Sequence, residues 1–177
     1  MKKFGVIFSL IVIYFVIYFL QVNFFSWFNI DGVQPNLFVL LALFIGIFIN
    51  GKVGTISGFI IGLYTDFLFS NSIGISAVIL ALVGFCGYIL EKRFSRDSKI
   101  TIVLMGLIST GLYEIIVIAF RAITMGATIS FIPFIYKIFV ELVYNSLLII
   151  ILYPLIHRFG IYAEEIFNSK KMLTRYF

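Results

Sequence analysis

The chain has 177 residues, of which 62% are hydrophobic and only 12% are charged, and its formal net charge is +5. Soluble domains average about 25% charged residues, so this composition excludes an ordinary soluble domain and indicates an integral membrane protein. The basic residues cluster at the ends of apolar segments. The positive charge therefore indicates membrane topology and anionic lipid headgroups, and it does not point to a nucleic-acid partner.

Six apolar segments can be marked along the chain. They are 4–24, 36–50, 53–70, 74–91, 100–121 and 131–156. Helices satisfy all their backbone groups internally, so each segment is expected to be a membrane helix. The predicted fold is all-α, a polytopic bundle of six transmembrane helices over residues 1–159.

The first apolar segment follows Lys2 and Lys3 and resembles a signal peptide. The bulky stretch from Gln21 to Trp27 offers no small-residue cleavage site, so we expect an uncleaved first transmembrane helix. Trp27, with its flanking phenylalanines, fits the aromatic belt at the outer surface of the membrane.

The second and third segments are short, with roughly 15 and 18 residues against the roughly 20 that an upright crossing needs. The turn Asn50-Gly51-Lys52 joins them, so we expect one helical hairpin over 36–70, and a re-entrant hairpin remains an alternative. Pro35 suits a helix entry, and Asn36 can cap the first turn. A contact of this pair with a partner protein is the other interpretation.

The third segment carries Gly54, Gly58, Gly62 and Asp66 at four-residue spacing. This spacing places them on one helical face, which drifts by about 40° per step. A glycine face lets a neighbouring helix approach closely in lipid. A carboxylate on it must point into a protein interface or a wet cavity, because facing lipid costs about 3 kcal/mol or more. We therefore predict a glycine-packed bundle with a buried acidic group.

The last two apolar segments add charges at depth. At about 1.5 Å rise per residue, Asp66, Glu114 and Lys137 reach nearly the same level in the outer half of the membrane. Because buried charges need partners, we expect these three to form a polar network. Arg121 would cap it near the outer surface, and Glu141 would lie one turn deeper than Lys137. The network is a fixed clasp between helices, a site for a polar ligand or proton, or a set of groups that face a partner or snorkel.

Residues 160–177 are too polar to cross a membrane. Tyr162, Ile166, Leu173 and Phe177 can share one helical face, which predicts an amphipathic cytoplasmic helix at the lipid surface. A frayed, solvated tail is the alternative.

The distribution of basic residues predicts the orientation. If both termini are cytoplasmic, eleven lysines and arginines lie inside and only Arg121 and Lys137 lie outside. This is the positive-inside pattern, and it supports an even number of spans.

No sequence motif of a hydrolase, a metal site or a phosphate-binding loop appears. His157 is the only histidine, and Cys86, the only cysteine, lies in an apolar run where a small packing residue is expected. We therefore expect no enzyme, no cofactor and no metal.

A set of short motifs resembles the MreD family of rod shape-determining membrane proteins. The motifs are Gln34-Pro35-Asn36-Leu37, Gly51, Gly54, Gly58, Gly62-Leu63, Asp66 and Gly74. In that family a Pro-Asp/Asn-Leu opening of the second helix precedes a glycine-rich third helix that ends in Gly-Leu-x-x-Asp. The size and the six spans are similar as well. Asn36 stands where many members carry Asp, which argues against an obligatory charge there.

The resemblance implies a non-catalytic scaffold of the bacterial cell-elongation complex in the cytoplasmic membrane. It would bind MreC and, through it, influence the RodA glycosyltransferase and a class B penicillin-binding protein, beside MreB filaments. The fold is also similar to the substrate-binding subunits of energy-coupling-factor vitamin transporters, which supply the alternative function. Those subunits usually dock through an Ala-x-x-x-Ala surface on the first helix, and residues 4–20 contain no alanine.

Overall fold

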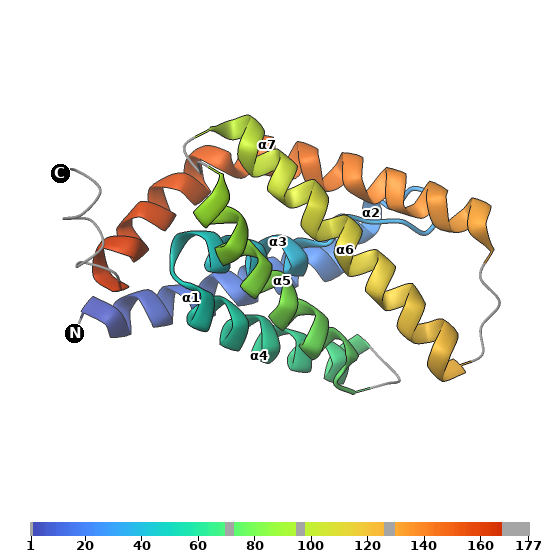
Figure 1. Cartoon of the computed structure of the whole chain (residues 1–177), viewed down its shortest axis with the longest axis horizontal. Helices are drawn as coiled ribbons and strands as arrows, with labels where there is room; N and C mark the ends of the chain where they lie inside the picture. The colour runs from blue at the N-terminus through green and yellow to red at the C-terminus, as the bar shows by residue number, and fades with distance from the viewer. Residues whose placement is uncertain (1, 70–72, 95–97, 126–129, 168–177) are drawn as a thin grey trace.

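A computed structural model describes residues 2–69, 73–94, 98–125 and 130–167. Its elements are α1 (Lys2–Phe19), η1 (Leu20–Phe24), α2 (Phe25–Trp27), α3 (Leu37–Phe48), α4 (Gly51–Phe69), α5 (Ile75–Arg93), α6 (Lys99–Met125) and α7 (Phe131–Phe167). All of these elements are helical, which confirms the all-α prediction for the described residues. In Figure 1, α1 and α3 to α7 run back and forth along the longest axis, so the start of α1 and the end of α7 lie at the same end.

Four stretches of the described chain are long and apolar enough to cross a membrane. They are Phe4–Trp27, Ile75–Arg93, Lys99–Phe120 and Phe131–Phe167. The predicted hairpin over 36–70 forms α3 and α4, but neither helix is among these four. The membrane character of the protein is thus supported, whereas the count of six complete spans stays a prediction.

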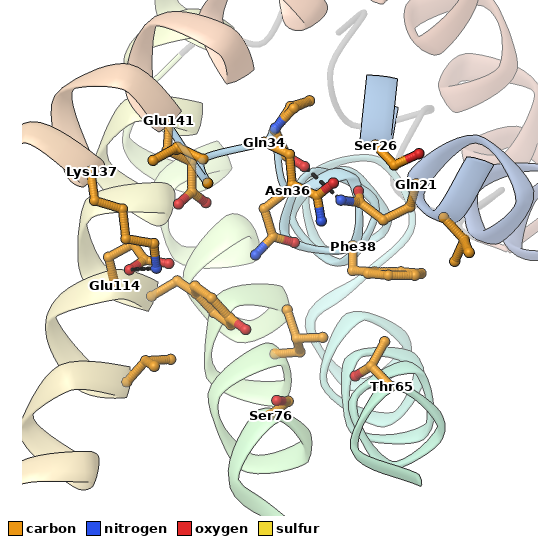
Figure 2. A pocket seen from close by; sticks show the side chains of 17 residues that line it. Gln21, Ser26, Gln34, Asn36, Phe38, Thr65, Ser76, Glu114, Lys137 and Glu141 are labelled. Atoms are coloured by element: carbon orange, nitrogen blue, oxygen red, sulfur yellow. Dashed lines mark hydrogen bonds and ion pairs between the residues drawn. The ribbon is translucent and has the colours of Figure 1, made fainter. Parts of the chain in front are cut away.

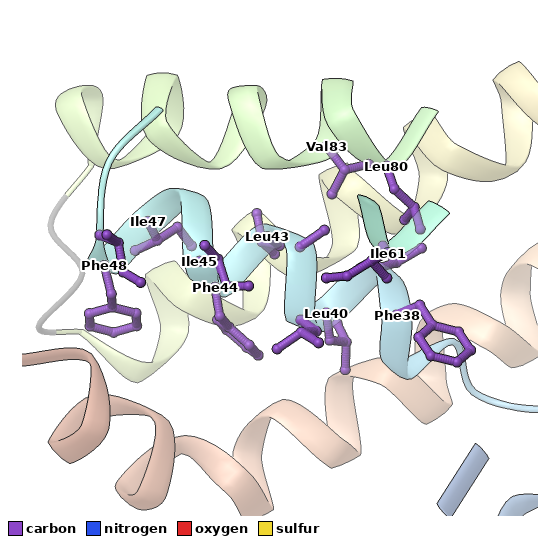
Figure 3. Close-up of a cluster of buried hydrophobic side chains, with 14 of the residues drawn as sticks. Phe38, Leu40, Leu43, Phe44, Ile45, Ile47, Phe48, Ile61, Leu80 and Val83 are labelled. Carbon is purple, nitrogen blue, oxygen red and sulfur yellow. The ribbon is translucent and has the colours of Figure 1, made fainter. Parts of the chain in front are cut away.

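The helix α3 is the centre of the bundle. All twelve of its residues are buried, among them Val39, Ala42 and Leu43 with no exposed surface. Figure 3 shows side chains such as Leu43 and Phe48 pointing from α3 towards the surrounding helices. A helix that is apolar on every side can be surrounded by other helices or by lipid, and here the other helices of the bundle bury it. At about 1.5 Å per residue, α3 is only about 18 Å long, which is shorter than the roughly 30 Å apolar layer of a membrane.

The glycine face of α4 lies against neighbouring backbone, as its spacing predicts. A Cβ atom on Gly58 would collide with the carbonyl oxygen of Leu80 in α5, and one on Gly62 would collide with Ala77. A Cβ atom on Gly54 would come within 2.6 Å of the Cα of Gly46 in α3. These approaches leave no room for a side chain.

The boundary predicted at residue 160 does not coincide with a helix end. α7 continues without interruption through Gly160 to Phe167. Gly160 is buried, and a Cβ atom on it would collide with the ring of Phe48 in α3. Residues 160–167 therefore extend the bundle, because their small residues let α7 close over the end of α3. The predicted amphipathic tail falls largely on 168–177, outside the described residues.

Candidate functional site

The amino end of α3 lies inside the bundle, where its free N–H groups need partners from the protein. Asn36 is the N-cap, and its side-chain oxygen accepts a hydrogen bond from the N–H of Val39 at 3.2 Å. This confirms the predicted capping role. Gln21 in η1 accepts from the N–H of Leu37 at 3.0 Å and donates to the carbonyl oxygen of Pro35 at 2.8 Å. One amide side chain thus holds both sides of the helix entry.

A second amide ties the same point to α6 and α7. The side-chain oxygen of Asn145 in α7 accepts from the backbone N–H of Asn36 at 3.0 Å. Its amide nitrogen donates to the hydroxyl of Thr110 in α6 at 2.9 Å. Asn145 and Thr110 are both buried. Three helices are therefore joined at the entry of α3 by hydrogen bonds between polar groups, two of which, Asn145 and Thr110, are buried.

Asp66 is fully buried, as predicted, but its partners differ from the expected ones. Its carboxylate accepts hydrogen bonds from the N–H groups of Gly74 at 2.8 Å, Ser76 at 3.3 Å and Ala77 at 3.3 Å. These are the first N–H groups of α5, so Asp66 caps that helix from α4. Gly74 itself has φ +104°, a conformation that favours glycine.

The expected network of Asp66, Glu114 and Lys137 therefore forms only in part, because Asp66 bonds to the backbone of α5 instead. Lys137 in α7 forms its ion pair with Glu114 in α6. The predicted common level of these two residues is correct. The side chain of Glu114 is 5% exposed and that of Lys137 is 41% exposed, so the lysine lies at an open edge of the bundle. The side chain of Arg121, the predicted cap of this network, lies outside the described residues.

Glu141 lies one turn beyond Lys137 along α7 and is only 2% exposed. Its Oε1 atom has no hydrogen-bond partner among the described residues. A buried carboxylate oxygen without a partner is costly in an apolar layer. The hydrogen bonds at the helix entries described above do not explain this atom.

A cavity of about 500 Å³ opens beside these groups. Its polar lining includes Gln21, Asn36, Ser76, Glu114, Lys137 and Glu141. Figure 2 shows the ion pair and Glu141 on one side, with Asn36 and Gln21 across from them. The cavity lies at the amino end of α3, because this short helix does not fill the bundle over its whole length.

The family model for the rod shape-determining protein MreD matches residues 1–161 of the chain. The match includes the glycine face and the entry of α3, and it ends within α7. The chain belongs to the MreD family. No curated protein and no solved structure matches it.

Membership of the MreD family identifies a rod shape-determining membrane protein. Two family-like motifs have a structural explanation here. The Pro35-Asn36-Leu37 opening forms the capped entry of α3, and Asp66 with Gly74 forms the capped entry of α5. Both motifs therefore begin a helix within the bundle of this MreD protein, which is a physical reason for their residue types.

Three polar residues of this region are not predicted from the sequence as site residues. They are Gln21, Thr110 and Asn145. The available signal was the presence of an amide or hydroxyl in an otherwise apolar run, which in lipid indicates a hydrogen bond between helices. The π-helical turn of η1 around Gln21 has no such signal in the residue pattern.

Proposed function

We propose that this MreD-family chain is a non-catalytic scaffold of the bacterial cell-elongation complex in the cytoplasmic membrane. In this role it binds MreC and thereby regulates peptidoglycan synthesis by RodA and a class B penicillin-binding protein, with MreB filaments on the cytoplasmic side. The observation that carries the proposal is the family match over residues 1–161.

The use of polar groups in the bundle supports a scaffold. Gln21, Asn36, Asp66 and Asn145 all bond to the backbone at helix entries. Such contacts make a rigid arrangement of helices, because each group would be left unpaired if its helix moved. A rigid bundle presents a constant surface to a single-span partner such as MreC.

The cavity beside Glu141 favours a second candidate, the substrate-binding subunit of an energy-coupling-factor transporter. A polar cavity of about 500 Å³ has the size of a small-molecule site. The first helix argues against this candidate. Phe4, Phe8, Phe15 and Phe19 are all strongly exposed on α1, where those transporter subunits carry a small-residue docking surface.

Recovery of partners from native membranes separates the two candidates. The tagged protein, solubilised in a mild detergent, is purified and its companions are identified by mass spectrometry. The scaffold predicts MreC and RodA, whereas the transporter predicts an ATPase pair with a transmembrane coupling subunit. Recovery of the second set without MreC would contradict the scaffold.

A matched pair of variants tests whether recovery of MreC depends on the close packing of the helices. Gly62→Leu places a side chain against the backbone of α5 and should reduce recovery of MreC together with rod shape in a complementation assay. Ile60→Leu changes a side chain that is 60% exposed on the same helix and should keep both.

A further inference from the structure

The lining of the cavity at the amino end of α3 has more acidic than basic side chains. It contains two carboxyl groups, Glu114 and Glu141, and one ammonium group, Lys137. Lys137 pairs with Glu114, so Glu141 is the carboxyl group of the described lining that lies outside that ion pair. A positively charged ligand could form a second ion pair in this cavity, with Glu141.

The orientation of Glu141 strengthens this conclusion. Figure 2 shows its carboxyl group pointing to the space between Lys137 and Asn36. The residue is 2% exposed, and its Oε1 atom has no hydrogen-bond partner among the described residues. A free acceptor in a low-dielectric site binds a charged N–H donor more strongly than a neutral one.

We propose that this cavity binds a small organic cation with a primary ammonium group, which donates to Oε1 of Glu141. The hydroxyl of Ser76 and the side chain of Asn36 line the same space and can receive a second polar end. Among the described residues no group of three or more histidine, cysteine or acidic side chains could hold a metal ion, so the donor set suits an ammonium better.

The walls of the cavity limit the size and shape of this ligand. Phe38, Leu80 and Val117 contribute apolar surface. A volume of about 500 Å³ is in the lower part of the range for small-molecule sites. The ligand should therefore have one ammonium end and a short apolar or hydroxylated body. Access is from the edge at Lys137, whose side chain is 41% exposed.

Thermal unfolding of the purified full chain in detergent tests the site with two matched probes. 4-Amino-1-butanol is protonated at pH 7, and 1,4-butanediol is its neutral analogue. A probe at about ten times its Kd should raise Tm by roughly 3–6 °C. We expect this shift with the amine and no shift with the diol. Equal shifts with both probes, or with sodium chloride at the same concentration, would overturn the proposal.

Two variants on different helices locate the effect. Glu141→Gln should abolish the shift with 4-amino-1-butanol, whereas Glu165→Gln, an exposed carboxylate of the same helix, should retain it. If Glu141→Gln does not fold, Val117→Phe fills the cavity from α6 and should raise the Kd at least about tenfold. Its control is Ile115→Phe at a position that is 56% exposed.

An unchanged response in Glu141→Gln or Val117→Phe would refute the assignment. This outcome is independent of the scaffold proposal, which is tested by the recovery of MreC.

Discussion

Single polar residues in this bundle act mainly on backbone groups. In water an N–H at a helix entry can bond to solvent, but in an apolar layer it needs a partner from the protein. Asp66 supplies that partner for α5, and Asn36 supplies it for α3. An isolated carboxylate in an apolar segment can therefore be explained in two ways. It can cap the start of a nearby helix, or it can pair with a distant cation.

These separate partners predict how substitutions of Asp66 and Lys137 combine in their effects on the free energy of unfolding. Asp66→Asn loses one of the two acceptor oxygens that receive the N–H groups of α5, which should cost about 1–3 kcal/mol. Lys137→Met affects Glu114 instead. Because the two sites share no described partner, the double variant should equal the sum of the single ones within about 0.5 kcal/mol. The measurement is the free energy of unfolding of the three variants in one detergent. A clear deviation from additivity would show that Asp66 and Lys137 interact after all.

The ion pair between Glu114 and Lys137 should respond unequally to loss of each member. Lys137→Met leaves a carboxylate that is 5% exposed without its cation, whereas Glu114→Gln leaves an ammonium that is 41% exposed and can reach water. Removal of one partner from a buried pair costs most when the remaining charge cannot be solvated. We expect a lower Tm for Lys137→Met than for Glu114→Gln. The reverse order would show that the lysine is the enclosed member.

At the scale of the helices, α3 and α4 have different roles in the packing, which follow from their lengths and from the residues on their surfaces. α3 has only twelve residues and is buried on every side, so it acts as the core. α4 contacts α3 and α5 through its glycines. The packing of a membrane bundle depends on such close approaches, because lipid supplies no hydrophobic force between helices.

A substitution pair on α4 tests this packing. Gly58→Leu would drive a side chain into the carbonyl group of Leu80, so it should separate α4 from α5 and lower the amount of folded protein several-fold. Ile60→Leu should have little effect, because this side chain is 60% exposed. Size-exclusion profiles of both variants in detergent give the comparison. Equal tolerance at both positions would contradict close packing at Gly58.

At the scale of the whole molecule, the helices alternate in direction and both ends of the described chain lie together. This arrangement agrees with an even number of passes. The excess of basic residues predicts that the shared end faces the cytoplasm.

Reporter fusions test the orientation directly. A reporter that is active only in the cytoplasm should be active after Phe177 and inactive when inserted in the connection between α4 and α5. An insertion at Asn50, between α3 and α4, should again be active. The physical reason is that Lys52 lies on the side with the other basic residues. The opposite pattern at these three positions would overturn the six-pass topology.

Much of the fold could be predicted because the membrane restricts the possible structures. Apolar segments of sufficient length must be helices, and counting residues along them gives depth. Depth placed Glu114 and Lys137 at one level, in agreement with their ion pair, but it did not single out this pair within the expected network. The same count put Asp66 at that level, yet it could not show that Asp66 faces the start of α5. Depth does not determine the rotation of a helix or the neighbour it faces.

The sequence by itself determined that this is an all-helical membrane protein with a glycine face and a buried acidic group, and it offered capping as one of two roles for Asn36. Each of these depends on local spacing and on the cost of polar groups in lipid. Only the tertiary structure decided which backbone groups Gln21, Asp66 and Asn145 bond to, and that Glu141 faces a cavity. Those partners come from other helices or from beyond a turn, so they are set by how the helices pack around α3.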